Sequence, residues 1–225
     1  MSPAGFDTLI LYDNASSNAS VRTRIVLYLK GIPFEWIEVD LIRDRLPNGR
    51  PFVELNNQGM VPTLCHKEFV LAQSFAIAEY LDEIQPQPRL LPSDIKARAF
   101  VRSLALLIAT DGQPIVNLRV RRFLQKKIGL SRDQLVGWMQ HWLSTSLNEY
   151  EGTMKMRGVS GPFSFGTEPT IADAFLVPQV LLAKRFGVDV SSYRQISAVY
   201  SHCMKLAAFE RAASEYVVKD AEYGI

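Results

Sequence analysis

Apolar and polar residues alternate in short runs near the start of the chain. Residues 8–12 and 34–39 are such runs, each bounded by polar turn residues, and they predict two strands. Residues 21–30 instead place apolar side chains on one helical face, and Gly31 ends the pattern. Strand, helix and strand within about thirty residues form a βαβ unit, so we expect two parallel strands joined by a right-handed crossover.

The next segment predicts a hairpin followed by a helix. Residues 61–66 and 69–72 are apolar runs joined by a polar pair, which is typical of antiparallel strands. Ser74 precedes apolar residues at helical spacing, so we expect its hydroxyl to cap a helix. Before the hairpin, residues 42–55 are polar and contain prolines, which predicts a loop with a short helix over 52–55.

A proline-rich segment separates this part from a helical one. Residues 85–94 contain three prolines within seven residues, which cannot continue a helix. We therefore expect an α/β domain over residues 1–84, a linker over 85–94 and an all-α helical bundle over 95–225. Residues 215–225 carry no clear pattern. The helical patterns lie at residues 95–111, 131–156, 170–186, 193–206 and 209–214.

Thr170 and Asp173 mark the start of one of these helices. Their spacing is that of a capping box, with aspartate in the place that glutamate or glutamine usually takes. We interpret the pair as a local structural signal rather than as part of a reaction centre.

The composition is that of an ordinary soluble globular protein, with 48% hydrophobic and 21% charged residues. The net charge of +2 predicts no strong attraction to nucleic acid or to an anionic membrane. One basic run, residues 119–127, indicates a solvated face or a surface that attracts anionic substrates to a cleft. We therefore expect no nucleic-acid partner.

Cysteine usage and apolar run lengths indicate the compartment. Cys65 and Cys203 lie in unrelated contexts without a CxxC pair, so neither a disulfide framework nor a metal site is predicted. Residues 1–7 lack the pattern of a signal peptide, and no continuous apolar run approaches the ~18 residues of a membrane span. These features predict a cytoplasmic protein that contacts no membrane.

The turn before the first helix has the chemistry of an anion-binding site. Ser16 and Ser17 lie between the first strand and the helical pattern. A helix N-terminus has unpaired N–H groups and about half a positive elementary charge. A thiolate or carboxylate is stabilised there, and a serine hydroxyl adds an adjustable donor.

Several motifs resemble the zeta class of soluble glutathione transferases. The segment from Ser17 to Ile25 is similar to the serine-serine-cysteine loop and arginine-x-arginine helix start of that class. The resemblance extends from Leu9 to Phe209. Its further segments, at the expected separations, are Val61-Pro62-Thr63-Leu64, Gln73-Ser74, Gln113-Pro114, Asn117-Leu118, Thr170-x-Ala172-Asp173, Leu176-Val177-Pro178-Gln179-Val180 and Arg185-Phe186.

The resemblance implies a fold and a reaction. The fold is a thioredoxin-like βαβ-ββα domain followed by a C-terminal helical bundle, assembled as a homodimer, with glutathione as cofactor. The reaction is cis-trans isomerisation of a small dienoic or oxo acid such as maleylacetoacetate or maleylpyruvate, as in aromatic amino-acid catabolism. Glutathione thiolate would add to the substrate and leave again, so that no glutathione is consumed.

The resemblance also implies which residues of the turn contact the thiol. When the motifs are aligned on Arg22, Ser17 takes the first serine position and would stabilise the thiolate. Asn18 then takes the second serine position and Ala19 takes that of the cysteine. Ser16 and Ser20 are close enough to compete with Ser17 for this role if the loop is one residue longer.

Two further pairs are implied to bind the remaining length of glutathione. A cis bond between Val61 and Pro62 would let the backbone of Val61 pair with the peptide as an added strand. Gln73 and Ser74 would receive the γ-glutamyl end at the start of a helix.

The helical part is implied to complete the site. Gln113 and Asn117 would face the cleft from the first long helix of the second domain. Arg185 would bind a substrate carboxylate, for which a planar bidentate donor is suited, and Arg22 is the second candidate for substrate binding.

Two positions depart from the class pattern. Ala19 stands where the class has a cysteine, and Pro47 stands where it often has a glutamine for the glycyl end of glutathione. That contact would fall to Asn48, Arg50 or His66. Two alternatives therefore stay open: conjugation or reductive dehalogenation of a small electrophile, and a non-catalytic glutathione- or ligand-binding module. A thiol-disulfide oxidoreductase is disfavoured, since no cysteine lies in the helix-start loop.

Overall fold

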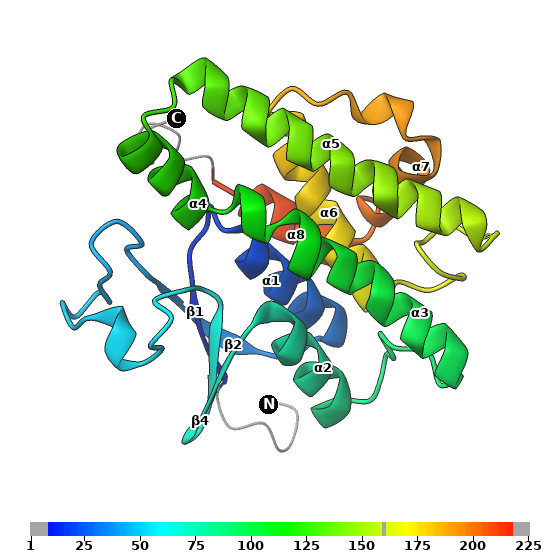
Figure 1. Cartoon of the computed structure of the whole chain (residues 1–225). Coiled ribbons are helices and arrows are strands. Elements are labelled where there is room, and N and C mark those ends of the chain that lie inside the picture. Colours follow the sequence, from blue (N-terminus) through cyan, green and yellow to red (C-terminus); the bar gives the residue numbers. More distant parts are fainter. Residues whose placement is uncertain (1–8, 159–160, 218–225) are drawn as a thin grey trace.

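The computed structural model describes residues 9–158 and 161–217 (Figure 1). These residues contain a four-stranded sheet with the strand order β2-β1-β3-β4. β2 runs parallel to β1, whereas β3 is antiparallel to both β1 and β4, which confirms the predicted crossover and hairpin. The strands are β1 (Leu9–Asp13), β2 (Phe34–Glu38), β3 (Thr63–His66) and β4 (Phe69–Ala72).

The helices cover one side of this sheet and continue into a helical layer. α1 packs against α2 and, on its far side, against α6 and α8, while α3 and α5 also contact α6 (Figure 1). The predicted fold class, a thioredoxin-like part followed by a helical part, is confirmed. The helices of the described residues are α1 (Asn18–Lys30), α2 (Ser74–Ile84), α3 (Ile95–Leu106), α4 (Leu118–Phe123), α5 (Arg132–Met156), α6 (Ile171–Arg185), α7 (Arg194–Cys203) and α8 (Ala207–Ser214).

α1 begins at Asn18, earlier than residue 21 where its apolar pattern begins. The first turn is polar but satisfied, because the Ser17 hydroxyl oxygen accepts the Ser20 N–H at 3.3 Å. Arg22 and Arg24 are almost fully buried on this helix. The buried side of α1 is therefore partly charged, which an apolar pattern cannot reveal.

The expectation that Ser74 caps α2 is wrong. The N-cap residue is Gln73, whose φ of 73° turns the chain into the helix, and its side chain caps no N–H group. Ser74 is the first residue of α2 and lies in its first turn. Ser74 resembles a cap in the sequence because serine is one of the preferred N-cap residues.

The placement of Gln113 and Asn117 on the first long helix is also wrong. α3 continues as a π-helix, Leu107–Gly112, and ends before Gln113. Asn117 instead begins the unpredicted helix α4, where its Oδ1 accepts the Val120 N–H at 3.0 Å. The basic run 119–127 thus lies in α4 and the following π turn, Leu124–Ile128.

Capping boxes begin the two long helices of the helical part. In α5 the Ser131 hydroxyl accepts the Gln134 N–H at 3.2 Å, and the Gln134 side chain accepts the Ser131 N–H at 2.9 Å. In α6 the Asp173 carboxylate accepts the Thr170 N–H at 2.7 Å. The capping box predicted at Thr170 and Asp173 is confirmed.

The two parts of the fold share one apolar core. Its buried residues extend from β1 and α1 through α6 to α8. At the other end of α1, the Lys30 ammonium contacts Asp82 and donates to the Gln85 carbonyl at 2.7 Å. α1 is therefore fixed both to the helical part and to the start of the segment 85–94, whose role as a linker stays a prediction.

One helical stretch of the described residues, Ile95–Ile128, is long and apolar enough to cross a membrane by length and composition alone. It is not one regular helix, because π-helical and 3₁₀ turns interrupt it between Leu107 and Val116. Val101 and Leu104 on this stretch are buried in the core described above.

Candidate active site

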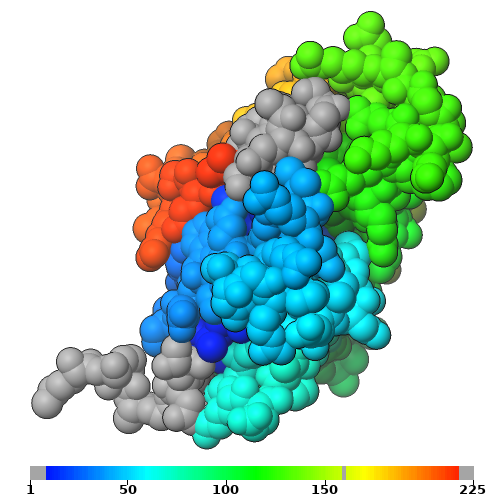
Figure 2. All heavy atoms as spheres, turned by 90° about the vertical axis from the view of Figure 1, so that its left-hand side faces the viewer, coloured from blue at the N-terminus to red at the C-terminus, as the bar shows by residue number. Residues whose placement is uncertain are grey.

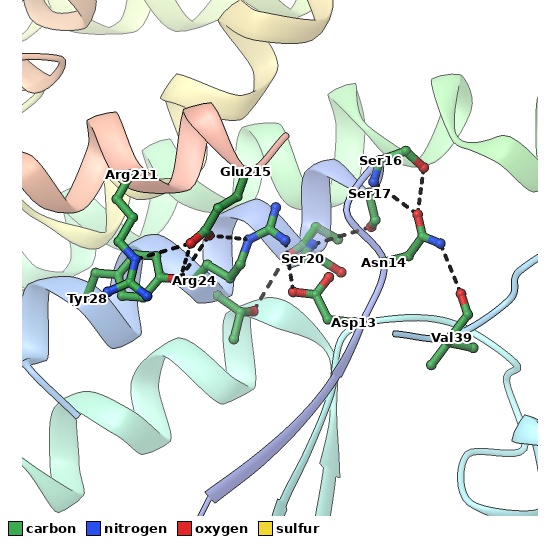
Figure 3. Close-up of polar contacts among 12 residues, drawn as sticks. Asp13, Asn14, Ser16, Ser17, Ser20, Arg24, Tyr28, Val39, Arg211 and Glu215 are labelled. Atoms are coloured by element: carbon green, nitrogen blue, oxygen red, sulfur yellow. Dashed lines mark hydrogen bonds and ion pairs between the residues drawn. The ribbon is translucent and has the colours of Figure 1, made fainter. Parts of the chain in front are cut away.

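Asn14 fixes the turn between β1 and α1. Its side-chain amide donates to the Val39 carbonyl at 2.9 Å, and its Oδ1 accepts the Ser16 N–H at 3.0 Å and the Ser16 hydroxyl at 2.6 Å (Figure 3). The backbone carbonyl of Asn14 accepts the Ser17 N–H at 2.9 Å. Asn14 was not predicted as a site residue, although asparagine is typical of such turns.

Ser17 is the N-cap residue of α1 and directly precedes its first residue, Asn18. Its hydroxyl oxygen accepts the Ser20 N–H, so the hydroxyl hydrogen is available for another partner. The Ser16 hydroxyl differs, because it donates to Asn14. Of the two serines, Ser17 is therefore the better placed to donate to an anion at the helix N-terminus.

Asn18 and Ala19 complete the turn in different ways. Asn18 is buried, and its Nδ2 donates to the Pro178 carbonyl of α6 at 2.9 Å. It therefore connects the start of α1 to the helical part. Ala19 contributes a methyl group and no polar side-chain atom, so it supplies no donor where the class has a thiol.

A buried ion pair lies beneath the turn. Arg24 Nη1 is 3.3 Å from Asp13 Oδ2, and both side chains are fully buried. The Arg24 guanidinium also lies 4.4 Å from the centre of the Trp36 ring. Burial raises the pKa of Asp13 to about 6, although Arg24 and Ser20 act to lower it. At neutral pH the Asp13 carboxylate therefore balances the Arg24 charge.

A cavity of about 490 Å³ opens beside the turn. Its walls are the turn itself, the segment before β3, the residues that follow α3, the helix α4 and the end of α6. The fold therefore brings together residues that are more than a hundred positions apart in the chain. Eight of the predicted site residues line this cavity: Ser16, Ser17, Asn18, Ala19, Val61, Gln113, Asn117 and Arg185.

The other four predicted site residues lie outside the cavity lining. Pro62 follows Val61 through a cis peptide bond, as predicted. Gln73 is adjacent to the cavity, because its side-chain amide donates at 2.9 Å to Gln58, which is in the lining, and Ser74 follows Gln73 in the chain.

Arg22 is a predicted site residue that is almost fully buried. Its side chain is 1% exposed and its guanidinium lies 4.8 Å from the centre of the Phe175 ring, between α1 and α6. Burial lowers the pKa of Arg22 to about 9. The structure therefore places Arg22 in the packing between two helices rather than in the cavity lining.

The alternatives for the glycyl end of glutathione also lie outside this lining. Arg50 forms an ion pair with Glu54 at 2.9 Å, and the His66 Nδ1 is 2.6 Å from the Tyr80 hydroxyl. The structure selects none of Asn48, Arg50 and His66.

Positive charge predominates around the cavity. Among the described residues its lining contains four arginines and one carboxylate, that of Asp44. Three of the arginines come from the basic run, so part of that run faces a cleft rather than open solvent. α4 lies next to the loop that follows β2 (Figure 2), where Arg122 Nη1 donates to the Leu41 carbonyl at 3.0 Å. The arginines are Arg119, Arg121, Arg122 and Arg185.

Arg185 is the last residue of α6. Its side chain is half-buried, and its Nη1 donates to the Tyr216 hydroxyl oxygen at 3.2 Å. Tyr216 was not predicted as a site residue, because residues 215–225 carry no pattern from which a role could be inferred.

Neither cysteine belongs to the cavity lining. Cys65 lies on β3 and Cys203 on α7, and both are buried. Burial raises the pKa of both thiols. Protonated, enclosed thiols are poor nucleophiles, so the site offers no protein thiol for redox chemistry.

Comparison with known proteins shows the family to which this chain belongs. The family model of the glutathione S-transferase N-terminal domain matches residues 16–84. A maleylpyruvate isomerase of Ralstonia sp is 41% identical over 90% of this chain and 95% of the relative.

Solved structures are similar over nearly the whole chain. A holo maleylpyruvate isomerase described as a bacterial zeta-class glutathione S-transferase has a TM-score of 0.87 at 40% identity, covering 93% of this chain and 99% of the other. A maleylacetoacetate isomerase from Anaeromyxobacter dehalogenans with glutathione bound in its active site has a TM-score of 0.78 at 34% identity, covering 91% and 94%. The chain therefore belongs to the zeta class of the glutathione S-transferases.

Proposed function

We propose that this protein is a glutathione-dependent enzyme that isomerises a small dienoic or oxo acid of the maleylpyruvate or maleylacetoacetate type. The observation that carries this proposal is a single cavity with an anion-stabilising helix start on one wall and arginines on the others. Relatives with those two activities, similar over nearly the full chain, support the same substrate class.

The α/β part supplies donors that suit glutathione. The Ser17 hydroxyl and the N-terminus of α1 would stabilise the thiolate and lower the pKa of the thiol below its usual ~8.5. Val61 lies in the cavity wall, and its backbone would pair there with an extended peptide. Gln58 and Gln73 form a pair of amides at the same wall and would face the γ-glutamyl end.

The arginines suit a substrate that carries more than one carboxylate. Arg185 and the three arginines of the basic run surround the cavity, where a dianion is attracted and oriented. The chemistry that glutathione supplies when bound is reversible addition of its thiolate to a double bond, which permits rotation before elimination. During that change, an arginine beside the carboxylate or carbonyl oxygen would stabilise the negative charge that develops there.

Enzyme assays with purified protein test this proposal. We expect isomerisation of maleylpyruvate or maleylacetoacetate that requires glutathione but does not consume it. Formation of a stable conjugate with a model electrophile, without isomerisation, would instead indicate a conjugating or dehalogenating enzyme. Glutathione binding without turnover of either kind would indicate a binding module, which is the outcome that contradicts an enzymatic role.

Arg185→Lys should raise the KM for the acidic substrate by about tenfold or more and leave the KM for glutathione unchanged. Lysine retains the charge but loses the planar pair of donors that fits a carboxylate. Steady-state kinetics with each substrate varied in turn measures both values. Arg132→Lys is the matched control, since Arg132 begins α5 outside the cavity lining. A raised KM for glutathione alone would remove Arg185 from substrate binding.

We also infer that the protein works as a cytoplasmic homodimer. Residues 1–84 and 95–225 would be its two domains, which share one apolar core and the site. The glutathione S-transferase family to which the chain belongs supports this assembly. Light scattering of the purified chain measures the number of subunits directly, and a monomer at working concentration would contradict it.

A further inference from the structure

The segment of residues 215–217, which follows α8, lies against the turn that contains Ser16 and Ser17. The Val217 N–H donates to the Ala15 carbonyl at 3.2 Å. Ala15 directly precedes Ser16, so the 215–217 segment contacts the backbone of the turn itself. The end of α8 and the start of α1, far apart in sequence, approach one another here (Figures 1 and 3).

Glu215 fixes this segment to α1. Its carboxylate accepts the Tyr28 hydroxyl, which is 2.8 Å from both oxygens, and it lies 3.6 Å from Arg24 Nε (Figure 3). Arg211 on α8 donates to the same carboxylate at 3.1 Å. The Glu215 side chain is 23% exposed, so its interactions are only partly screened by water.

Arg24 connects Glu215 to Asp13, which is the last residue of β1. It is fully buried and stands between two carboxylates, those of Asp13 and Glu215. Removing either carboxylate would leave the buried Arg24 charge less compensated. The 215–217 segment is therefore positioned by the same residues that support the turn from below.

Tyr216 lies between these two fixed neighbours, and its hydroxyl oxygen accepts from Arg185 Nη1 at 3.2 Å. Arg185 has a long side chain with several rotatable bonds, and an acceptor at one Nη restricts them. Phenylalanine would fill the same space without offering this acceptor.

We propose that Tyr216 is a specificity-determining positioning residue, which sets the direction in which the Arg185 guanidinium meets the carboxylate of the substrate. This inference rests on the proposed function, because it requires that Arg185 binds an acidic substrate. It adds a connection between the two halves of the site, since the segment that orients Arg185 also contacts the thiol-binding turn.

Tyr216→Phe tests the role of the hydroxyl. We expect the KM for the acidic substrate to rise roughly fivefold to tenfold, as is typical for loss of one hydrogen bond. The KM for glutathione should stay unchanged. Tyr193→Phe is the matched control, because the Tyr193 hydroxyl donates to the Ser144 carbonyl at 3.4 Å outside the cavity lining.

A double-mutant cycle separates positioning from a general structural effect. In the Arg185→Met background, Tyr216→Phe should change the KM no further, because the residue through which it acts is gone. The same fold-change in both backgrounds, or an unchanged KM in the single variant, would overturn the inference.

The same double-mutant cycle can be measured without turnover. Calorimetry gives the affinity of each variant for maleate in the presence of glutathione. Suppose that the wild-type protein binds maleate but isomerises nothing, and that the binding cycle shows coupling between Tyr216 and Arg185. The proposed function then fails and the positioning role stands. If the protein isomerises its substrate but neither cycle shows coupling, the positioning role alone fails. Absence of both maleate binding and isomerisation overturns both.

Discussion

Ser17→Ala should lower kcat/KM for the isomerisation by about 10²-fold to 10³-fold, the usual effect of removing one donor that stabilises a reacting anion. Ser17 is the hydroxyl of the turn whose hydrogen is not already donated to Asn14. Without this hydroxyl, the pKa of the thiol of bound glutathione should rise. A pH titration of the thiolate absorbance measures this pKa. Steady-state kinetics gives the change in rate.

Two control variants separate this effect from loss of a helix cap. Ser131→Ala removes the N-cap of α5, a comparable local change outside the cavity lining, and should cost about 1 kcal/mol of stability without lowering the rate. Ser16→Ala should reduce kcat/KM by less than Ser17→Ala, because its hydroxyl supports the turn rather than the anion. If Ser16→Ala had the larger effect, the thiol contact would belong to Ser16.

Asp173→Ala should destabilise the folded chain by about 3–5 kcal/mol, because three hydrogen-bond donors would lose their acceptor inside the core. The fully buried Asp173 carboxylate accepts the Ser164 N–H and the Thr170 N–H, each at 2.7 Å, and the Thr170 hydroxyl at 2.8 Å. α6 packs on α1, so loss of its first turn weakens the contact on which the active site depends. Equilibrium unfolding in urea measures the change in free energy.

Asp189→Ala is the matched control for that prediction. Asp189 caps a short 3₁₀ turn, where its carboxylate accepts the Ser191 N–H at 2.9 Å and the Ser191 hydroxyl at 2.6 Å in exposed surroundings. Water can replace this acceptor, so we expect a much smaller loss of stability. Equal losses in the two variants would show that burial of the Asp173 carboxylate has no special importance.

The main elements of the fold were predictable because their apolar residues follow a regular period. β1 and the long helix α5 have one side in the core, and this gives a pattern that local sequence retains. α4 was missed because it has only six residues, three of them arginines, and carries no apolar stripe. Similarly, the buried side of α1 includes Arg22 and Arg24, so an apolar pattern in the sequence does not show its full extent.

The candidate site was predictable where a residue's role depends on local backbone. The helix start at Ser17 is of this kind, whereas the cis bond before Pro62 was implied by the family resemblance; both are present. The direction of a side chain depends instead on what packs beside it. Arg22 lies over Phe175 from α6, whereas Arg185, the other predicted substrate residue, reaches the cavity.

The sequence by itself therefore determined the order of the main elements, the turn that offers a helix N-terminus to an anion, and the family. Only the tertiary structure decided that the basic run faces the cavity, that Asn14 fixes the turn, and that residues 215–217 connect Arg185 to that turn. These features join segments far apart in the chain, and their hydrogen bonds and charge pairs form only when folding brings the segments together. Neither periodicity nor local motif spacing carries that information.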